Sequence, residues 1–428
     1  MEYDIKKIYQ LFDPAPLLSD ETDLYVPLDD VRGSTGLVTK LSRTIRLSSE
    51  KPTCQLLAGH IGSGKSTELQ RLRKELESGE ERFFTVFCDI LMYIDPQDTD
   101  FLDILIPMIC SMACDIRDRC KIEIKPGYFR QRWDEIKEVF GAEINFNEVG
   151  LSLGLGQISA KMKSSPKTRL EIRKHLEPNT NNWIDAANEV ISQAALELTK
   201  KGYKGLVIIV DGLDKLPVMK SSWAEQSVAE LVFIGRHSQM TAFRCHTVYA
   251  IPLGLAYSCR ERDIASLYGI TAPPVVPMTK IFDEDGKKWI AGFSKFKEII
   301  IKRIKKAGAD ESIFENKQVL DKIIEYSGGQ PRLLTILIRD SIIEGELPIA
   351  LKAVNNVVRK ITHSYERQLR EEHWKIVKEV KKSHSLNRNE KNDYLCMDLL
   401  GNCAVLQYIN DKEWYGVNPL LPKRSAKK

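Results

Sequence analysis

The segment with the clearest chemical signature is rich in glycine and lies between an apolar run and a helical pattern. It extends from Gly59 to Thr67 and fits G-x-x-x-x-G-K-[ST] at every fixed position. Glycines let the backbone curl so that successive amides face one concavity, and the N-terminus of a following helix adds its attraction for phosphate oxygens. Lys65 would then pair with the β and γ phosphates of a nucleotide, and Ser66 would offer magnesium a hydroxyl ligand.

The alternative interpretation of this segment is a glycine-rich turn before a helix. An apolar strand over Cys54 to Ala58, the motif, and helical periodicity from Glu68 to Leu76 are all in register, which favours phosphate binding. His60 occupies a variable position of the motif and is interpreted as a spacer rather than a catalyst. The residues expected to bind the nucleotide here are Gly59, His60, Ile61, Gly62, Ser63, Gly64, Lys65, Ser66 and Thr67.

A second candidate segment is an apolar run that ends in carboxylates. Leu206 to Val210 is apolar at every position, and Asp211-Gly212-Leu213-Asp214 follows it. Asp211 is expected at the carboxyl edge of a strand beside Ser66, where it would hold magnesium directly or through water. Asp214 would polarise the attacking water. The alternative is that both are turn residues, because Asp-Gly is a common turn sequence.

A third segment, Ser327 to Arg332, reads Ser-Gly-Gly-Gln-Pro-Arg. The glycines stop one helix, and Pro331 starts the next helix in its first turn. Arg332 would lie near the start of that second helix, from where its guanidinium could reach back to a γ phosphate. An ordinary helix–helix turn with a surface arginine is the alternative. Pro331 and Arg332 complete the set of expected nucleotide-binding residues.

Continuously apolar strands separated by helical patterns predict an α/β fold, with a parallel sheet covered by helices on both faces. The expected strands are Cys54 to Ala58, Phe83 to Ile90, Gly205 to Val210, His246 to Ile251 and Val275 to Ile281. Helices are expected over 35–50, 101–120 and 183–201, and the mixed residues 121–165 are interpreted as an insertion that could contain a hairpin.

After residue 285 the pattern becomes helical. Helices are expected over Phe296 to Lys306, Lys317 to Tyr326, Pro331 to Glu344 and Ile349 to Arg370. The last segment predicts helices over Trp374 to Lys382 and Asp393 to Leu400, then a β-hairpin, which together suggest a small winged-helix module. The predicted domains are an arm and linker helix (1–50), the sheet-containing core (51–290, with an insertion at about 121–180), a helical lid (291–370) and the winged-helix-like module (371–428).

Composition excludes several classes of protein. The chain has 428 residues, of which 43% are hydrophobic and 29% are charged, as in an ordinary globular protein that needs no disulfide scaffold. The 63 basic and 59 acidic residues leave a net charge of +4, so bulk charge does not imply nucleic-acid binding. Nine cysteines without metal or redox spacing, no secretory signal and no apolar stretch long enough for a bilayer predict a soluble, cytoplasmic protein without membrane contact.

The three motifs, in this order and followed by a helical lid, resemble the AAA+/STAND superclass of P-loop ATPases. The resemblance covers roughly residues 20–340 and extends to bacterial STAND-like and origin-recognition-type proteins. It implies that Lys65, Ser66, Asp211 and Asp214 carry the Walker roles and that Arg332 takes the sensor 2 position. It also implies that the arm Leu24 to Gly33 packs near the adenine. ATP and magnesium are the implied cofactors, and the lack of a guanine-reading N/TKxD-like segment favours ATP over GTP.

Two departures from the superclass pattern bear on catalysis. No Asn or Arg follows the fourth expected strand where a sensor 1 residue would stand, and Thr247 is a weak substitute. The second acidic residue is Asp214 rather than the neighbour of Asp211. Slow hydrolysis, or nucleotide used as a conformational switch, is compatible with both. Arg260 and Arg262 stand where an inter-subunit arginine finger is often found, although surface arginines on a helix are the commoner explanation.

Two functional hypotheses follow. In the first, the chain is an ATP-binding and ATP-hydrolysing switch that controls its own assembly, or a separate effector protein, in bacterial defence or signalling. In the second, it is a DNA-binding AAA+ initiator or loader. The expected recognition helix Asp393 to Leu400 is acidic and apolar, whereas phosphate binding needs basic clusters, so a module that contacts protein is favoured. The expected partners are ATP and ADP, with a homo-oligomer or a hetero-complex.

Overall fold

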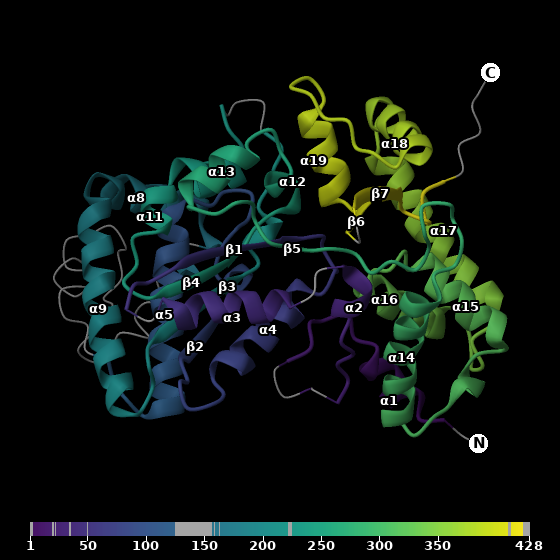
Figure 1. Ribbon diagram of the computed structural model, residues 1–428, viewed down its shortest axis with the longest axis horizontal. Helices are drawn as coiled ribbons and strands as arrows, with labels where there is room; N and C mark the ends of the chain where they lie inside the picture. The colour runs from purple at the N-terminus through teal and green to yellow at the C-terminus, as the bar shows by residue number, and fades with distance from the viewer. Residues whose placement is uncertain are drawn as a thin grey trace. The chain divides into compact units, whose positions relative to one another are not determined.

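The computed structural model describes residues 3–18, 21, 23–33, 36–48, 50–124, 156–157, 159–161, 163–220, 225–409 and 412–422. The chain divides into two compact units (Figure 1). The first comprises Met1–Leu37, Gly59–Glu68 and Val275–Lys428, and the second comprises Val38–Ala58 and Leu69–Pro274. The glycine-rich segment is therefore grouped with the helical lid and the C-terminal residues. The predicted domain boundaries stay a prediction.

The second unit is built on parallel strands. Its members are β1 (Cys54–Gly59), β2 (Phe84–Asp89), β3 (Leu206–Asp211) and β4 (His246–Ala250). They follow the order β2-β3-β4-β1, and β5 (Val275–Val276) completes the five-stranded sheet. Every described pairing among the first four strands is parallel. β3 is buried at all its positions, as expected of a central strand that is covered on both faces. The predicted α/β fold is confirmed.

Helices lie on both sides of this sheet (Figure 1). The long ones are α3 (Leu37–Leu47), α4 (Lys65–Leu76), α5 (Phe101–Cys120) and α9 (Thr180–Lys200). The predicted bounds of α5 are confirmed even though Pro107 lies inside the helix. A capping box between Asp100 and Asp103 fixes its start, and almost the whole first half of α5 is buried. Burial of that many side chains offsets the roughly 3 kcal/mol that an internal proline costs a helix.

The predicted insertion is described only in part, because residues 125–155, including the suggested hairpin, lie outside the described residues. Its later part forms α8 (Pro166–Leu176), followed by the 3₁₀ turn η2 (Glu177–Asn179). Arg169, with a side chain only 3% exposed, pairs with Asp98 at 2.7 Å. Arg173 pairs with Asp98 at 2.5 Å and also with the buried Asp103. These ion pairs fasten α8 to the start of α5.

Short elements connect the strands of the second unit. After β2 comes η1 (Ile90–Met92), which is capped by Asp89. After β3 come η3 (Leu213–Lys215), α10 (Val228–Glu230), a π-helical turn η4 (Leu231–Gly235) and α11 (His237–Met240). After β4 come α12 (Leu253–Ala256) and α13 (Glu261–Leu267). The predicted strand Val275 to Ile281 is wrong in length, since β5 ends at Val276 and the chain then enters loop contacts of the first unit.

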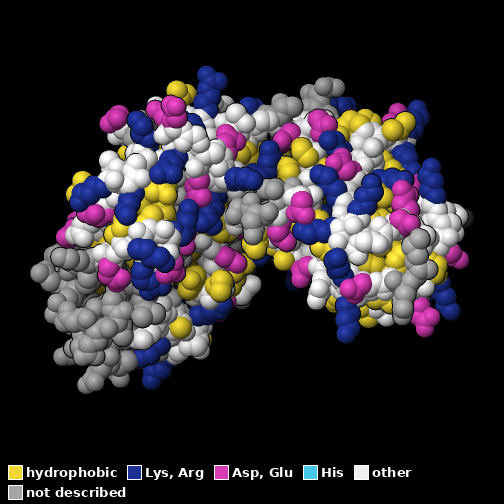
Figure 2. Space-filling model, turned by 90° about the horizontal axis from the view of Figure 1, so that it is seen from below, with side chains coloured by type: hydrophobic (Ala, Val, Ile, Leu, Met, Phe, Trp, Pro, Cys, Tyr) yellow, Lys and Arg dark blue, Asp and Glu magenta, His cyan; other side chains and the backbone are white. Residues whose placement is uncertain are grey.

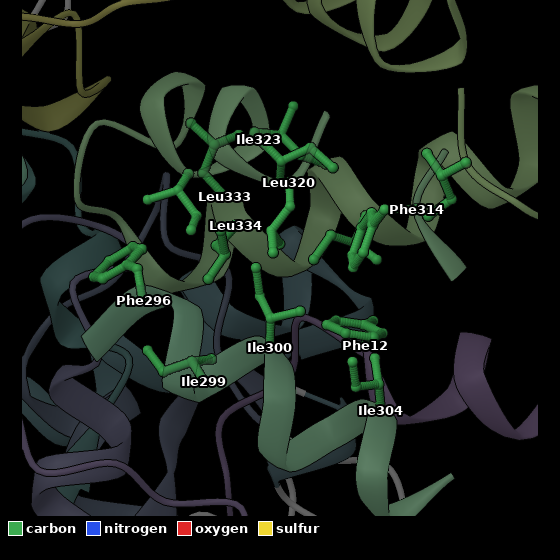
Figure 3. Close-up of a cluster of buried hydrophobic side chains, with 14 of the residues drawn as sticks. Phe12, Phe296, Ile299, Ile300, Ile304, Phe314, Leu320, Ile323, Leu333 and Leu334 are labelled. Carbon is green, nitrogen blue, oxygen red and sulfur yellow. The ribbon is translucent and has the colours of Figure 1, made fainter. Parts of the chain in front are cut away.

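The core of the first unit is formed by helices. These are α14 (Ile290–Lys306), α15 (Lys317–Tyr326), α16 (Pro331–Glu344) and α17 (Leu351–Gln368), with η5 (Glu311–Ile313) between α14 and α15. The predicted bounds of α15 and α16 are confirmed, while α14 begins six residues before the predicted Phe296. Phe296, Ile300 and Leu334 are fully buried and point into one apolar cluster (Figure 3). Phe12 of the N-terminal arm joins the same cluster.

The arm contains α1 (Ile5–Leu11) and α2 (Asp29–Arg32). Basic residues of α14 hold this arm. Lys306 pairs with Asp23 at 2.8 Å, Lys295 pairs with Asp30 at 3.5 Å, and Lys302 donates to the carbonyl of Tyr25 at 2.7 Å. The basic character of α14 is thus explained by contacts with the arm.

The C-terminal module, residues 371–422, follows α17 in the first unit. It consists of α18 (Glu371–Ser383), α19 (Asp393–Gly401) and the antiparallel strands β6 (Val405–Ile409) and β7 (Glu413–Val417). The predicted helices and hairpin are confirmed, while the assignment as a winged helix stays a prediction. Tyr408 and Trp414 stack across the two strands with ring centroids 4.4 Å apart. Together with Met278 and Leu406 they form a small core.

The surface has no single dominant sign of charge on the face seen in Figure 2, where Lys and Arg side chains are interspersed with Asp and Glu. This pattern agrees with the near balance of 63 basic and 59 acidic residues. Among the described residues, no helix combines the length and the apolar character that crossing a bilayer requires.

Candidate functional site

The candidate site is the loop between β1 and α4, in the first unit. Gly59 ends β1 and Lys65 begins α4, so the strand is one residue longer than the predicted Cys54 to Ala58, and the helix begins three residues before the predicted Glu68. Gly59, Gly62 and Gly64 have φ values of +153°, +78° and +100°. Residues with a Cβ atom rarely adopt such positive φ angles, so this backbone conformation favours glycine at all three positions.

The carbonyls of this loop all accept hydrogen bonds. Lys65 Nζ donates to the carbonyls of Gly59 and His60 at 2.6 and 3.0 Å. The carbonyl of Gly62 accepts from the backbone N–H of Arg332 at 3.3 Å. The carbonyls of Ile61 and Ser63 accept from the side chains of Gln330 and Arg32, and the carbonyl of Gly64 accepts from the backbone N–H of Glu68 at 3.0 Å. These hydrogen bonds satisfy the loop carbonyls and hold the loop backbone in place.

Lys65 is the charged group of the loop and is 4% exposed. A buried ammonium needs acceptors, and the two loop carbonyls supply them. A nucleotide phosphate would offer stronger, charged acceptors at the same loop. Ser66 and Thr67, in the first turn of α4, are half-buried. The hydroxyl of Ser63 is buried and has no hydrogen-bond partner among the described residues, which leaves a donor available inside the loop.

The predicted lid segment lies directly on this loop. Pro331 is the first residue of α16, and Gln330 before it donates from Nε2 to the carbonyl of Ile61. A Cβ added to Gly62 would come within 2.9 Å of both the Gln330 amide and the Cβ of Arg332. The structure therefore brings Gly62 and Arg332, which the sequence predicted to share a site, into contact.

The side chain of Arg332 is exposed and lines a cavity of about 360 Å³. The cavity also borders Ile61 of the loop, Tyr365 of α17 and Asn402 after α19. Arg332 is therefore on the side of the loop that faces the lid and the C-terminal module. Its predicted contact with a γ phosphate stays a prediction.

His60 connects the loop to the C-terminal module. It is 1% exposed, its Nε2 accepts from the backbone N–H of Gln407 at 2.8 Å, and its Nδ1 lies 3.0 Å from the carbonyl of Leu400. The accepting Nε2 implies that Nδ1 carries the proton. Burial lowers the pKa of His60 to about 3, so the ring is neutral. His60 is thus a structural bridge with specific partners, a role that the variable position in the motif did not suggest.

Cys403 and Ile61 strengthen the same connection. Cys403 has a φ of +60°, and its thiol lies 3.5 Å from the carbonyl of Ile61 and 3.6 Å from Nε2 of Gln330. The side chain of Ile61 packs against the small core that contains Met278, Leu406 and Trp414. Loop, lid turn and C-terminal module meet at one point of the first unit.

Asp211 and Asp214 belong to the second unit. Asp211 is the last residue of β3 and is 8% exposed, and Asp214 is half-buried in η3. Asp211 is in register with Asp89 at the end of β2, so two carboxylates end neighbouring parallel strands at the carboxyl edge. Lys65 and Ser66 belong to the other unit, and the magnesium site that Ser66 would share with Asp211 stays a prediction.

The structure also places the residues considered for a sensor and for an arginine finger. Thr247 lies near the amino end of β4, in register with Cys54 at the start of β1. This is the end of the strand opposite to the carboxyl edge, so Thr247 is wrongly placed to substitute for a sensor residue. Arg260 directly precedes α13 and pairs with Asp263 in the first turn of that helix, as expected of a surface arginine. Arg262 is exposed on the same helix.

The contact of Arg32 with the loop was not predicted from the sequence, which placed this residue only within the arm Leu24 to Gly33. Arg32, at the end of α2, donates to the carbonyl of Ser63 and pairs with Glu68 at 3.2 Å. Its only sequence signal was its position in the arm that precedes the core. The contacts of Gln330 and Cys403 were missed for the same reason, because nothing local marks a partner hundreds of residues away.

A parallel sheet in the order β2-β3-β4-β1-β5, with a glycine-rich loop between β1 and α4, defines the P-loop ATPase fold. No protein family model matches the chain, and no curated protein matches it. Solved structures do. The chain is similar to the Walker-type ATPase PABY2304 of Pyrococcus abyssi, at 14% identity over 96% of this chain and 98% of that chain, with a TM-score of 0.46.

It is also similar to the ORC2 protein of Aeropyrum pernix, solved as ADPNP–ADP complexes, at 12% identity over 96% of this chain and 94% of that chain, with a TM-score of 0.44. A third similar structure is that of the Drosophila ORC bound to DNA, at 11% identity over 97% of this chain and 89% of that chain, with a TM-score of 0.38. At such identities the likeness concerns the fold alone. What the individual residues do has to follow from the contacts of this chain.

Proposed function

We propose that the chain binds ATP with magnesium at the Gly59–Thr67 loop, hydrolyses it slowly, and uses the occupancy of the loop as a conformational switch. The observation that carries this proposal is the set of hydrogen bonds on the loop carbonyls. The donors come from the loop lysine, the arm, the lid turn and, through Cys403, the C-terminal module. A bound phosphate that shifts the loop backbone would therefore change the hydrogen bonds that the loop makes with each of these elements.

Each residue of the site has a role in this proposal. Lys65 would exchange its two carbonyl acceptors for β and γ phosphate oxygens, since charged acceptors bind an ammonium more strongly. Ser66 and Asp211 would hold magnesium, which when bound neutralises charge on the phosphates. Asp214 would orient the attacking water, and Arg332 would reach the γ phosphate from the lid. The lack of a guanine-reading segment favours ATP.

The switch requires that ATP and ADP bind two arrangements of the first unit with different affinities. Lys65 and Arg332 provide that difference, because both would respond to the third phosphate. Slow turnover suits such a device, since the chain offers no polar sensor residue at the carboxyl end of β4, where Ala250, Ile251 and Pro252 stand. The output would be self-assembly, or control of a separate effector protein in defence or signalling.

Binding of Mg-ATP by calorimetry tests this function. Lys65→Ala should weaken binding by about 10- to 100-fold, because each charged hydrogen bond to phosphate is lost. Lys74→Ala is the matched control, since Lys74 is an exposed lysine on the same helix, α4. It should bind as the unchanged chain does. If the unchanged chain takes up no Mg-ATP at millimolar concentration, the proposal fails.

A DNA-binding initiator is the second candidate, and one observation bears on it. α19, the expected recognition helix, is mostly buried, and the carbonyl of its Leu400 lies 3.0 Å from Nδ1 of His60. Its exposed Tyr394 and half-buried Asp398 offer no positive charge to a phosphate backbone. The exposed basic residues lie on α18 instead, at Lys375, Lys378, Lys381 and Lys382. Binding to duplex DNA that is salt-dependent and lost in Lys378→Glu/Lys382→Glu would favour this candidate.

A further inference from the structure

Arg32 is the buried arginine that faces the phosphate-binding loop. It is the last residue of α2, directly before Gly33 with a φ of +71°, and it is 3% exposed. Val31 beside it packs into the apolar core of the lid helices, which holds α2 in place. The guanidinium is therefore presented to the loop from a fixed piece of backbone.

Three nitrogens of this guanidinium each bind a different part of the first unit. Nη2 donates to the carbonyl of Ser63, and Nη1 pairs with the Glu68 carboxylate at 3.2 Å. Nε donates to the hydroxyl of Thr279 at 3.3 Å. Only a planar fork with donors in fixed directions can make these three contacts at once. Ser63 and Glu68 lie on either side of Lys65 in the sequence, so Arg32 fixes the backbone before and after that lysine.

Two further observations tie Arg32 to the geometry of the loop. A Cβ on Gly64 would lie 3.2 Å from Nη2 of Arg32, so the guanidinium packs against the backbone of the loop's last glycine. Thr279, the third partner, donates its N–H to the carbonyl of Gly329, and a Cβ on Gly329 would lie 1.7 Å from the Thr279 carbonyl. Arg32 thereby connects the loop with the glycine turn that precedes Arg332.

Burial makes this arrangement sensitive to each partner. Desolvation lowers the pKa of Arg32, and the charge of Glu68 opposes that effect. Glu68 itself is 4% exposed and has Tyr25 of the arm 3.4 Å away as a further hydrogen-bond donor. Removing one partner of such a buried ion pair destabilises the fold, because the other charge is left buried without a partner. Replacing both partners by apolar groups often leaves the stability unchanged. A double replacement can therefore keep the stability of the fold while it removes the contacts of Arg32 with the loop, which separates a role in stability from a role in positioning.

We propose that Arg32 is a positioning residue of the phosphate-binding loop, which holds the Ser63 carbonyl and the first turn of α4 so that the loop amides face the phosphates. The inference rests on the proposed nucleotide binding and adds a residue outside the motif to it. Arg32→Lys keeps the charge opposite Glu68 but cannot make three directed contacts. It should keep the thermal midpoint close to that of the unchanged chain and weaken Mg-ATP binding by about 10- to 100-fold.

The experiment compares four chains: unchanged, Arg32→Lys, Arg32→Met/Glu68→Leu, and Arg303→Met. The double variant removes both buried charges, so its thermal midpoint should stay close to that of the unchanged chain. Its affinity for Mg-ATP should nevertheless be weakened, as in Arg32→Lys. Arg303 is the matched control, because it is a buried arginine of the same unit whose hydrogen bond goes to the carbonyl of Ile299 on its own helix. Arg303→Met should keep its affinity for Mg-ATP whatever its change in stability, because the hydrogen bond of Arg303 does not reach the loop.

Hydrogen exchange over residues 59–68 in nucleotide-free protein gives a readout that does not depend on binding. Exchange should rise by about tenfold or more in Arg32→Lys and in the double variant, and stay unchanged in Arg303→Met. Unaltered exchange and unaltered affinity in Arg32→Lys and in the double variant would overturn the inference. A chain that binds no Mg-ATP, yet shows the faster exchange, would overturn the proposed function and leave the positioning role of Arg32 supported.

Discussion

The backbone N–H of Gln407 donates a hydrogen bond to Nε2 of His60 at 2.8 Å, across 347 positions of sequence. The other ring nitrogen is 3.0 Å from the carbonyl of Leu400, so one neutral tautomer satisfies both contacts. A protonated ring could not accept from Gln407. The bridge between the Gly59–Thr67 loop and the C-terminal module therefore requires an uncharged histidine.

Stability should fall in acid because of this histidine. The pKa of His60 is lowered to about 3 by burial, from an ordinary value of 6.5. The unfolded chain then binds a proton that the folded chain does not, so the contribution is complete above pH 6.5 and is lost progressively as the pH falls toward 3. At pH 5 the loss should be about 2 kcal/mol relative to neutral pH.

His60→Gln removes the titration, and urea unfolding between pH 5 and pH 8 measures the effect. The free energy of unfolding of the unchanged chain should drop more steeply with acid than that of His60→Gln. His246, whose pKa is also lowered by burial, to about 4, is present in both chains and cancels in the difference. Parallel curves for the two chains would contradict a neutral, buried His60.

Gly329 is expected to be the least replaceable glycine of the lid turn. Its φ is +78°, and a Cβ there would lie 1.7 Å from the carbonyl oxygen of Thr279. Gly308 has nearly the same φ, +80°, in the same unit, with nothing within 4 Å of an added Cβ. Gly308→Ala should cost about 1 kcal/mol for the backbone alone, while Gly329→Ala should cost about 3 kcal/mol or more.

Thermal or denaturant unfolding of the two alanine variants measures the difference, which isolates the contact with Thr279 from the strain of the backbone. Equal losses of stability would mean that the loop after β5 can move aside. In that case the link from Gly329 to Thr279, and onward to Arg32, would not fix the lid turn.

Catalysis should depend on the carboxylates that end β3. Asp211→Asn should lower magnesium-dependent ATP hydrolysis by about 100-fold or more, since magnesium would lose a charged ligand. Asp214→Asn should lower turnover by about 100-fold while leaving nucleotide affinity unchanged, as expected for a group that acts on water. Release of phosphate and calorimetry with Mg-ATP measure the two quantities separately.

Asp89→Asn is the matched control for these variants. It removes the same charge from the register partner of Asp211, but the exposed Asp89 already serves as the cap of η1 through the N–H of Leu91. Its turnover should remain close to that of the unchanged chain. A loss as large as that of Asp211→Asn would transfer part of the metal-binding role to β2.

Assembly should follow the state of the nucleotide. Size-exclusion chromatography with light scattering, in ADP and in ATP, should show a change of mass for the unchanged chain and none for Lys65→Ala. Lys74→Ala should behave as the unchanged chain. Identical masses in every condition would argue against self-assembly and leave control of a separate effector as the output of the switch.

Local sequence signals predicted much of the fold. The boundary between α15 and α16 was predicted because two glycines stop one helix and Pro331 begins the other, and such signals act within a few residues. The strands β1 to β4 were predicted because buried parallel strands are apolar without interruption. The length of β5 was not predicted correctly. Beyond Val276, the N–H groups of Met278 and Thr279 donate to the carbonyls of Gln407 and Gly329 instead of continuing the strand.

The candidate site divides in the same way. The motif predicted the loop, the glycine angles and Lys65, because their chemistry depends on adjacent residues. It did not predict that Arg32, Gln330 and Cys403 hold the loop carbonyls, nor that His60 bonds to β6. Those partners are distant in sequence, and their residue types carry no signal until the fold brings them together.

The dependence of the loop on Gln407 and Cys403 has a genetic consequence. A screen for chains that no longer capture ATP should recover lesions close to the carboxyl terminus as readily as lesions in the glycine-rich motif itself. Truncated versions made to isolate a minimal enzyme would lose the same support, so the hairpin should be retained in any shortened form meant to remain active.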